Sequence, residues 1–178
     1  MLAAGSPGWL TPGGRPGGDA RYRERSMNAY PPPAPSVRLV VGYDGSPPAD
    51  RALDAAVRLL AGRTGSITAV YVAHMASTAM LSADALVELE NDFDQIEREL
   101  RTAVDERLRG RVDDWGFERR QGLIAHELIA AAEEVHAARP DDTVGVVIGS
   151  SSSAVHRMVG SVPVNLARHS PVPLIIVP

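Results

Sequence analysis

Two short segments near the C-terminus combine residue types that bind anions in proteins. Gly149 is followed by four serines, and Gly160-Ser161 precedes a segment with helical spacing. At the start of a helix, unpaired backbone N–H groups, a partial positive charge and nearby hydroxyls would together bind a phosphate. A plain strand–loop–helix connection explains the same residues, with Ser161 serving only as a helix cap. The spacing alone leaves both interpretations open.

Several other chemistries are excluded by residue types that the sequence lacks. All 18 basic residues are arginine, so there is neither a P-loop lysine nor a lysine for a Schiff base. No cysteine is present, which excludes disulfides, thiol nucleophiles and cysteine-bound zinc. His126-Glu127 begins the zinc motif H-E-x-x-H, but position 130 is alanine, and Gly149-x-Ser151-x-Ser153 lacks the last glycine of G-x-S-x-G. We therefore predict no catalytic residues and no metal site.

Apolar runs and helical spacings alternate along residues 37–178. Strands are predicted at 37–41, 67–72, 117–121, 144–148 and 174–177. Helices are predicted between Ser46 and Gly62, and at 82–113, 123–138 and 161–169. Such alternation indicates an α/β fold with a mostly parallel sheet, right-handed crossovers and helices on both faces.

The loops that follow the strands are the expected place for a site, because parallel sheets bind ligands beyond the carboxyl ends of their strands. The loops concerned follow Val41, Val72 and Ile148. Asp44 lies in the first of them. An Asp-Gly pair after a strand is also a common turn, in which the carboxylate accepts hydrogen bonds from local amides.

The segment 82–113 is rich in both acids and arginines. Its apolar residues recur at three- and four-residue steps. Its charges form four-residue pairs at Asp94/Arg98, Glu97/Arg101 and Asp105/Arg109. A solvated helix face with ion pairs explains this pattern, and we prefer that interpretation to an active-site carboxylate cluster.

Residues 1–36 differ in composition from the rest of the chain. Glycine and proline dominate them without a periodic apolar pattern, so we predict a disordered or linker-like tail, and Met27 is an alternative start of the protein. The net charge of −4 favours neither nucleic acid nor an anionic membrane as a partner. Because cysteine, a signal sequence and an apolar span are all missing, we expect a cytoplasmic protein.

Motifs in the folded part resemble the universal stress protein family. They are Leu39-Val40-Val41-Gly42-Tyr43-Asp44-Gly45-Ser46, Val70-Tyr71-Val72, Val147-Ile148-Gly149, Gly160-Ser161-Val162 and the segment 171–177. The resemblance implies one α/β domain over residues 37–178. It also implies a five-stranded parallel sheet in the order 3-2-1-4-5, as in the adenine-nucleotide alpha-hydrolase-like fold.

In one branch of this family, the resemblance implies a site for ATP with Mg²⁺ that needs no P-loop lysine. Asp44 would then lie by the ribose or a metal-bound phosphate, and Val72 would contact the adenine. The residues at the matching positions are Gly42, Tyr43, Asp44, Val72, Ile148, Gly149, Ser152, Gly160, Ser161 and Val162.

The sequence departs twice from the ATP-binding pattern G-x2-G-x9-G-[ST]. Ser152 replaces the second glycine, and only residues 153–159 separate it from Gly160. A loop shorter by two residues loses up to about 7 Å of reach. If the second position needs a left-handed backbone, serine costs about 1–2 kcal/mol there. We expect both changes to weaken the binding of a triphosphate, whereas the contacts of Asp44 and Val72 with adenosine would be retained.

The resemblance implies a dimeric regulatory or binding module of the stress response, with an adenine nucleotide as its expected ligand. The alternative is a family member that has lost nucleotide binding and acts through protein contacts. The two departures from the ATP-binding pattern favour this alternative. Slow ATP hydrolysis is a weaker candidate, because Asp44 is the only general base in view. The apolar segment 172–177, from Val172 to Val177, would pair with a second subunit as an edge strand, although an ordinary covered strand explains it too.

Overall fold

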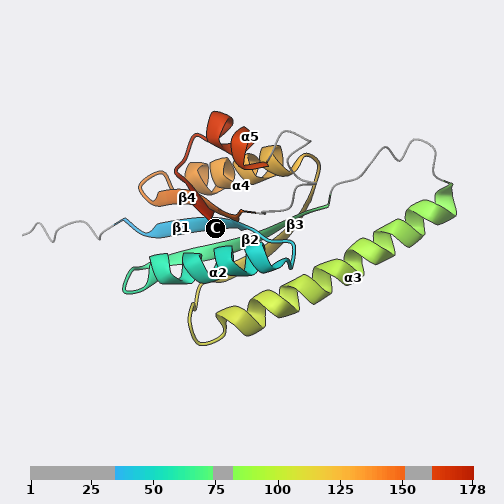
Figure 1. Cartoon of the computed structure of the whole chain (residues 1–178), viewed down its shortest axis with the longest axis horizontal. Coiled ribbons are helices and arrows are strands. Elements are labelled where there is room, and N and C mark those ends of the chain that lie inside the picture. The colour runs from blue at the N-terminus through green and yellow to red at the C-terminus, as the bar shows by residue number, and fades with distance from the viewer. Residues whose placement is uncertain (1–34, 74–81, 151–161) are drawn as a thin grey trace, which may run out of the picture. The chain divides into compact units, whose positions relative to one another are not determined.

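The computed structural model describes residues 35–73, 82–150 and 162–178. Within these ranges, strands and helices alternate along the chain, as the sequence predicts (Figure 1). The elements are β1 (Val37–Gly42), α2 (Pro47–Leu60), β2 (Gly65–Ala73), α3 (Ala83–Leu108), β3 (Trp115–Gln121), α4 (Ile124–Ala138), β4 (Thr143–Gly149), α5 (Val162–His169) and β5 (Leu174–Val177).

The five strands form one parallel sheet in the order β3-β2-β1-β4-β5. The strand β1 lies at the centre and pairs with β2 on one side and β4 on the other. The predicted fold class, a five-stranded parallel sheet in this order with helices on both faces, is therefore confirmed. The winding direction reverses between β1 and β4, which is where sheets of this type bind ligands.

One face of the sheet is covered by α2 and α3. Because side chains alternate along a strand, Leu39 and Val41 of β1 both point to this face and are buried there. The helix α2 begins after Ser46, whose hydroxyl accepts a hydrogen bond of 3.4 Å from the backbone N–H of Ala49. Leu53, on the inner side of α2, is fully buried against the strands.

The other face is covered by α4 and α5. Val40 and Val146, from the two central strands, are fully buried on this side. Leu128 of α4 and Leu166 of α5 pack in the same core. The two sides of the sheet thus have separate apolar cores, and residues at successive strand positions belong to different ones.

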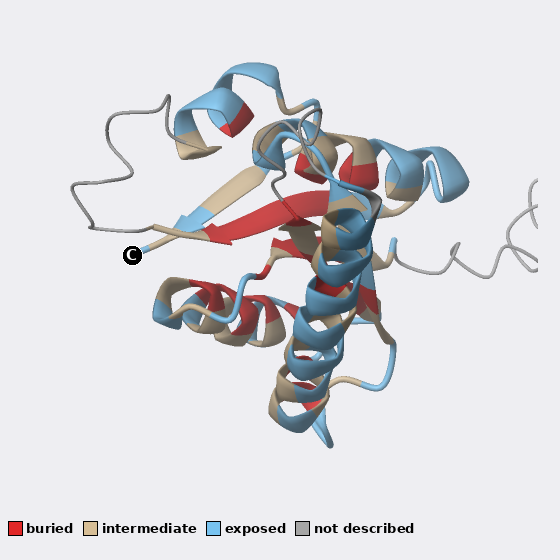
Figure 2. Ribbon diagram, turned by 90° about the vertical axis from the view of Figure 1, so that its right-hand side faces the viewer, coloured by how far each residue is buried: buried red, intermediate tan, exposed pale blue. Residues whose placement is uncertain are grey.

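The helix α3 is the longest element, with 26 residues. Its C-terminal half carries the fully buried Val104 and Leu108, whereas its N-terminal half extends beyond the strands (Figure 1). Most of its surface is exposed (Figure 2). It ends at Leu108 rather than near residue 113 as predicted, because Gly110 adopts a left-handed backbone with φ of 71° that stops the helix.

At the amino ends of the strands, Arg38 of β1 links three parts of the domain. Its guanidinium donates hydrogen bonds to Asp142, Asp114 and the hydroxyl of Ser66, at 2.9–3.0 Å. Asp142 also accepts a hydrogen bond of 3.0 Å from the backbone N–H of Ser36. This network joins β1 to β2 and to the turns before β3 and β4.

The predicted tail, residues 1–36, lies outside the described residues except for Pro35 and Ser36. The proposed alternative start at Met27 is likewise outside them. Among the described residues, no helix combines the length and the apolar character needed to cross a membrane.

Candidate functional site

The carboxyl ends of β1, β2 and β4 lie side by side in the sheet (Figure 1). Gly42, at the end of β1, is in register with Val70 of β2, so that Val72 extends two residues farther. Gly149 ends β4 on the other side of β1. We refer to this part of the sheet, beyond residues 42, 72 and 149, as the carboxyl edge.

Four of the predicted site residues lie on the face covered by α4 and α5. Ile148 is buried in the core on this side, and the half-buried Val72 and Val162 pack against that core. Gly42 faces the same way, because a Cβ built on it would lie 3.2 Å from Leu128. Of these residues, Val72 and Val162 keep part of their apolar surface exposed at the carboxyl edge, and such a surface suits the flat ring of a ligand.

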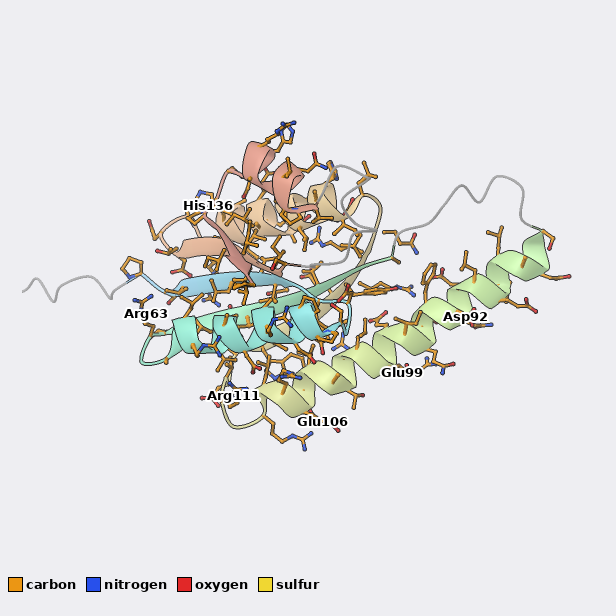
Figure 3. All side chains as sticks on the ribbon, in the orientation of Figure 1. Arg63, Asp92, Glu99, Glu106, Arg111 and His136 are labelled. Carbon is orange, nitrogen blue, oxygen red and sulfur yellow. The ribbon has the colours of Figure 1, made fainter. Side chains whose placement is uncertain are left out.

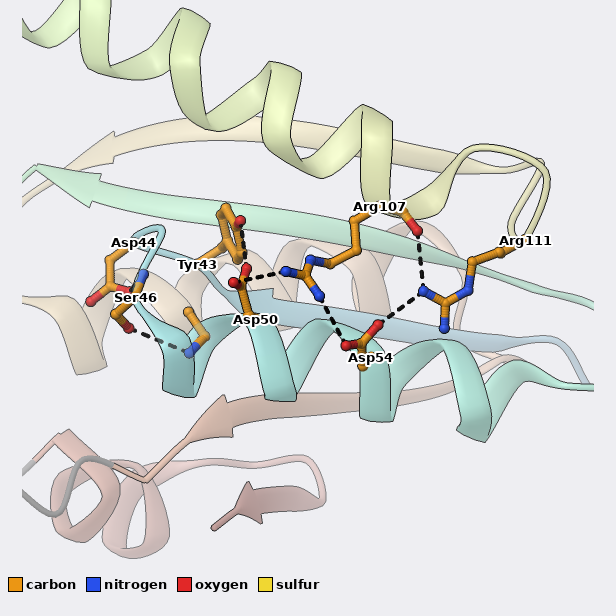
Figure 4. Close-up of polar contacts among 8 residues, drawn as sticks. Tyr43, Asp44, Ser46, Asp50, Asp54, Arg107 and Arg111 are labelled. Carbon is orange, nitrogen blue, oxygen red and sulfur yellow. Dashed lines mark hydrogen bonds and ion pairs between the residues drawn. The ribbon is translucent and has the colours of Figure 1, made fainter.

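Tyr43 points to the opposite face, between α2 and α3. Only 3% of it is exposed, and its hydroxyl donates a hydrogen bond of 2.9 Å to Asp50 (Figure 4). Burial, together with this bond, raises the pKa of Tyr43 to about 12. Asp50 also forms an ion pair of 2.8 Å with Arg107 of α3. The side chain of Tyr43 thus contributes to the packing between helices rather than to the apolar core that contains Ile148 and contacts Val72.

Asp44 is exposed in the turn between β1 and α2. One of its carboxylate oxygens accepts a hydrogen bond of 3.0 Å from the backbone N–H of Ser46 (Figure 4). This is the local turn that the sequence allowed as the plain explanation of Asp44. The other oxygen has no hydrogen-bond partner within the described residues, so the carboxylate keeps the capacity to accept a bond from a ligand.

The N-terminus of α2 also lies at the carboxyl edge, but it offers no amide to an anion. Pro47 and Pro48 occupy its first two positions and have no N–H group. The next two amides, of Ala49 and Asp50, donate to the side chain and the backbone carbonyl of Ser46. A phosphate at this edge would therefore need donors from another segment, and the serine-rich residues after Gly149 are the candidates.

Three predicted site residues, Ser152, Gly160 and Ser161, lie outside the described residues. The structure thus places Gly42, Val72, Ile148 and Val162 together and directs Tyr43 elsewhere, and it gives no account of these three. In the described part of the chain, no group of three or more histidine or acidic side chains could hold a metal ion.

Sequence reasoning missed a cavity of about 500 Å³ between α3 and the turn after β1. Tyr43, Gly45 and Asp50 line one side of it, and Leu100 and Arg107 line the other. The apolar spacing of residues 82–113 predicts a helix packed on the domain. The same spacing does not predict the cavity, because the cavity depends on how α3 packs against the turn after β1 and the start of α2.

A sequence model of the Universal stress protein family matches residues 37–178. The chain belongs to the universal stress protein family. The match extends over the whole sheet and all of its helices.

Solved structures of universal stress proteins have the same fold. One in complex with cAMP is 27% identical with a TM-score of 0.57, over 82% of this chain and 98% of that chain. A family member from Burkholderia pseudomallei is 23% identical, with a TM-score of 0.53 over 79% and 95% of the two chains. One from Arabidopsis thaliana with AMP bound is 14% identical, with a TM-score of 0.50 over 79% and 90%. The last two establish likeness of fold alone. A search of the curated proteins found no match.

Proposed function

We propose that this universal stress protein is a regulatory binding module that takes an adenine nucleotide at its carboxyl edge. The observation that carries the proposal is the meeting of Gly42, Val72 and Ile148 at the switch point of the sheet. The universal stress protein in complex with cAMP, to which the chain is 27% identical, gives independent support.

In this proposal, the nucleotide is divided between an apolar and a polar part of the site. The adenine would lie against Val72, which is partly exposed near the end of β2. The free carboxylate oxygen of Asp44 would accept a hydrogen bond from a ribose hydroxyl. The phosphate would bind amides and hydroxyls of the segment that follows Gly149, since α2 has no free amides to offer.

We further propose that a ligand with one phosphate, such as AMP or cAMP, binds better than ATP with Mg²⁺. The loop between Ser152 and Gly160 is two residues shorter than the ATP-binding pattern requires, which removes up to about 7 Å of reach around a triphosphate. Pro47 and Pro48 remove two amides that could otherwise compensate. Asp44 remains the candidate for contact with a metal-bound phosphate if ATP does bind.

Calorimetric titration of the full chain with cAMP, AMP and ATP–Mg²⁺ tests the proposal. We expect cAMP or AMP to bind at least about tenfold more tightly than ATP, because the shortened loop loses phosphate contacts. Asp44→Ala should weaken binding about tenfold or more, whereas Asp113→Ala, at an exposed acid near the amino ends of the strands, should not. Absence of binding for all three nucleotides at millimolar concentration would favour the alternative, a member that acts through protein contacts.

We also propose that two chains pair through β5. In the described sheet this strand lies at the edge, and Ile176 is 45% exposed. The exposed backbone groups of such an apolar edge strand favour pairing with a second copy, and Pro173 and Pro178 at its ends would limit the length of the paired segment.

Light scattering tests this pairing and should detect a dimer that Ile176→Lys converts to a monomer. Leu123→Lys, at an apolar residue that is 68% exposed elsewhere, is the matched control. A monomer at micromolar concentration would contradict this pairing.

A further inference from the structure

A seven-residue repeat runs along the exposed side of α3. Leu89, Ile96 and Ala103 recur every seventh residue, and an acid follows each of them three positions later, at Asp92, Glu99 and Glu106. Residues seven apart lie nearly above one another on a helix, and residues three apart are neighbours. The helix therefore presents two parallel rows, which we call the apolar row (Leu89, Ile96, Ala103) and the acidic row (Asp92, Glu99, Glu106).

The apolar row is only partly covered by the rest of the domain. Ile96 is 36% exposed, and Leu89 and Ala103 are partly exposed. At its C-terminal end, the row runs into the cavity of about 500 Å³ beside the turn after β1, whose lining includes Ala103. On the other side of this cavity lie Gly45 and Asp50. The result is an apolar strip on the helix that ends in a preformed hollow.

The acidic row carries charge that the domain does not neutralise. Asp92, Glu99 and Glu106 are all exposed, and none of them forms an ion pair among the described residues (Figure 3). Glu99 accepts a hydrogen bond from Gln95, which is neutral. The nearest cation of the cavity, Arg107, is already held by Asp50 and Asp54 at 2.8 and 2.9 Å. Other acids of α3, such as Glu90 and Asp94, are paired with Arg119, whereas Asp84 and Glu88 near the start of the helix also lack an ion pair among the described residues.

From these observations we infer that the exposed side of α3 is a docking surface for a cationic amphipathic helix of a partner protein. Apolar side chains of such a helix would pack on the apolar row as far as Ala103, at the edge of the cavity that Glu99 and Glu106 also line. Its lysines or arginines, spaced about one heptad apart, would meet Asp92, Glu99 and Glu106.

A second copy of this chain does not fit the same surface. Two α3 helices packed antiparallel through their apolar rows would bring their acidic rows to the same side of the interface, where like charges repel, and parallel packing would leave each acidic row without a cation. The formal charge of −4 for the chain adds to this repulsion. The charge pattern selects a basic partner.

The probe for this surface is a fluorescein-labelled peptide of three heptads, each Leu-Ala-Ala-Leu-Lys-Ala-Lys. We expect it to bind the full chain with an affinity that falls as salt is raised, and to slow amide hydrogen exchange over residues 89–106. The triple variant Asp92→Asn/Glu99→Gln/Glu106→Gln should weaken binding about tenfold, since three charge pairs at the rim are lost. Ile96→Ser should weaken it through loss of apolar contact.

Two controls separate this docking from general attraction between charges. The triple variant Asp113→Asn/Glu133→Gln/Asp141→Asn changes the net charge equally at exposed acids outside the acidic row, and should leave the affinity within about twofold. A peptide with glutamate in place of lysine should not bind. Equal weakening in the two triple variants, or protection from exchange outside α3, would overturn the proposal. So would concentration-dependent self-association that the acidic-row variant abolishes, because α3 would then pair with a second copy.

Discussion

Gly149 and Pro48 approach so closely that only glycine fits at position 149. A Cβ built on Gly149 would lie 2.2 Å from the carbonyl oxygen of Pro48 and 2.7 Å from its Cβ. The first turn of α2 crosses the end of β4 at this point, so the end of β4 and the start of α2 are fixed against each other. Glycine at 149 is therefore required by packing, whether or not a ligand approaches it.

The first prediction is that Gly149→Ala destabilises the fold. The added methyl group would force the backbone of α2 away from β4, and overpacking of this kind costs about 1–3 kcal/mol in the free energy of unfolding. Urea denaturation measures the change. Gly116→Ala is the matched control, because a Cβ at Gly116 in β3 meets nothing within 4 Å. Equal stability of the two variants would show that the contact with Pro48 relaxes without cost.

The second prediction concerns the buried hydroxyl of Tyr43. Tyr43→Phe removes its hydrogen bond to Asp50 and should lower the free energy of unfolding by about 1 kcal/mol at neutral pH. The pKa of Tyr43 is raised to about 12 in the folded protein, so its contribution is complete below pH 10, the ordinary tyrosine value, and is lost as pH rises towards 12. The variant should lack that alkaline loss in a denaturation series.

The same variant tests where Tyr43 acts. Because its side chain lies between α2 and α3, Tyr43→Phe should leave nucleotide affinity within about twofold of the unchanged protein. Val72→Asp, at the carboxyl edge, should abolish it. A large loss of affinity in Tyr43→Phe alone would mean that the hydroxyl contacts the ligand.

The fold followed from the sequence because its signals are local and repeated. Apolar runs alternated with helical spacings, and the motif around Asp44 identified the family that fixes the strand order. The alternation of side chains along the first strand also predicts that Tyr43 points to the same face as Val41, two residues before it. The site prediction followed the family motif instead and did not use this alternation. The motif consists of residues that are adjacent in sequence, but the side chains of adjacent strand residues point to opposite faces of the sheet.

Features that depend on contacts between different helices and strands could not be predicted from the sequence. The predicted pair Asp94/Arg98 illustrates this, because Asp94 instead pairs with Arg119 of β3 at 2.9 Å. Glu97/Arg101 and Asp105/Arg109 do pair as predicted, at the four-residue spacing along the helix. The close approach of Pro48 to Gly149 could not be foreseen for the same reason. It depends on the crossing of a helix and a strand that are a hundred residues apart in sequence.

The third prediction is a pH dependence at the amino ends of the strands. The hydrogen bond from Arg38 lowers the pKa of Asp142, so the carboxylate stabilises the fold above its ordinary pKa near 4. That stabilisation is lost as pH falls through the lowered pKa. In Arg38→Gln, the free energy of unfolding should therefore decline less steeply below pH 4 than in the unchanged protein. Arg98→Gln, at an exposed arginine of α3, should keep the original slope, and equal slopes in all three proteins would contradict the assignment.

Two adjacent arginines of β3 hold helices on opposite faces of the sheet. Arg119 pairs with Glu90 and Asp94 of α3 at 2.8 and 2.9 Å, and Arg120 pairs with Glu134 of α4 at 2.6 Å. Successive side chains of a strand point to opposite faces, which explains the division. Arg119 is therefore the main polar link between the sheet and the outlying half of α3.

The fourth prediction is that Arg119→Gln loosens that half of α3 while Arg120→Gln does not. Loss of two or three partly exposed ion pairs, each worth about 0.2–1 kcal/mol, should accelerate amide hydrogen exchange over residues 84–97 about fivefold. Residues 104–108 should be unaffected, because Val104 and Leu108 are fully buried against the domain. Arg120→Gln should instead accelerate exchange in α4 around Glu134. Identical exchange profiles for the two variants would mean that apolar contacts alone hold α3, and that the docking surface forms without help from β3.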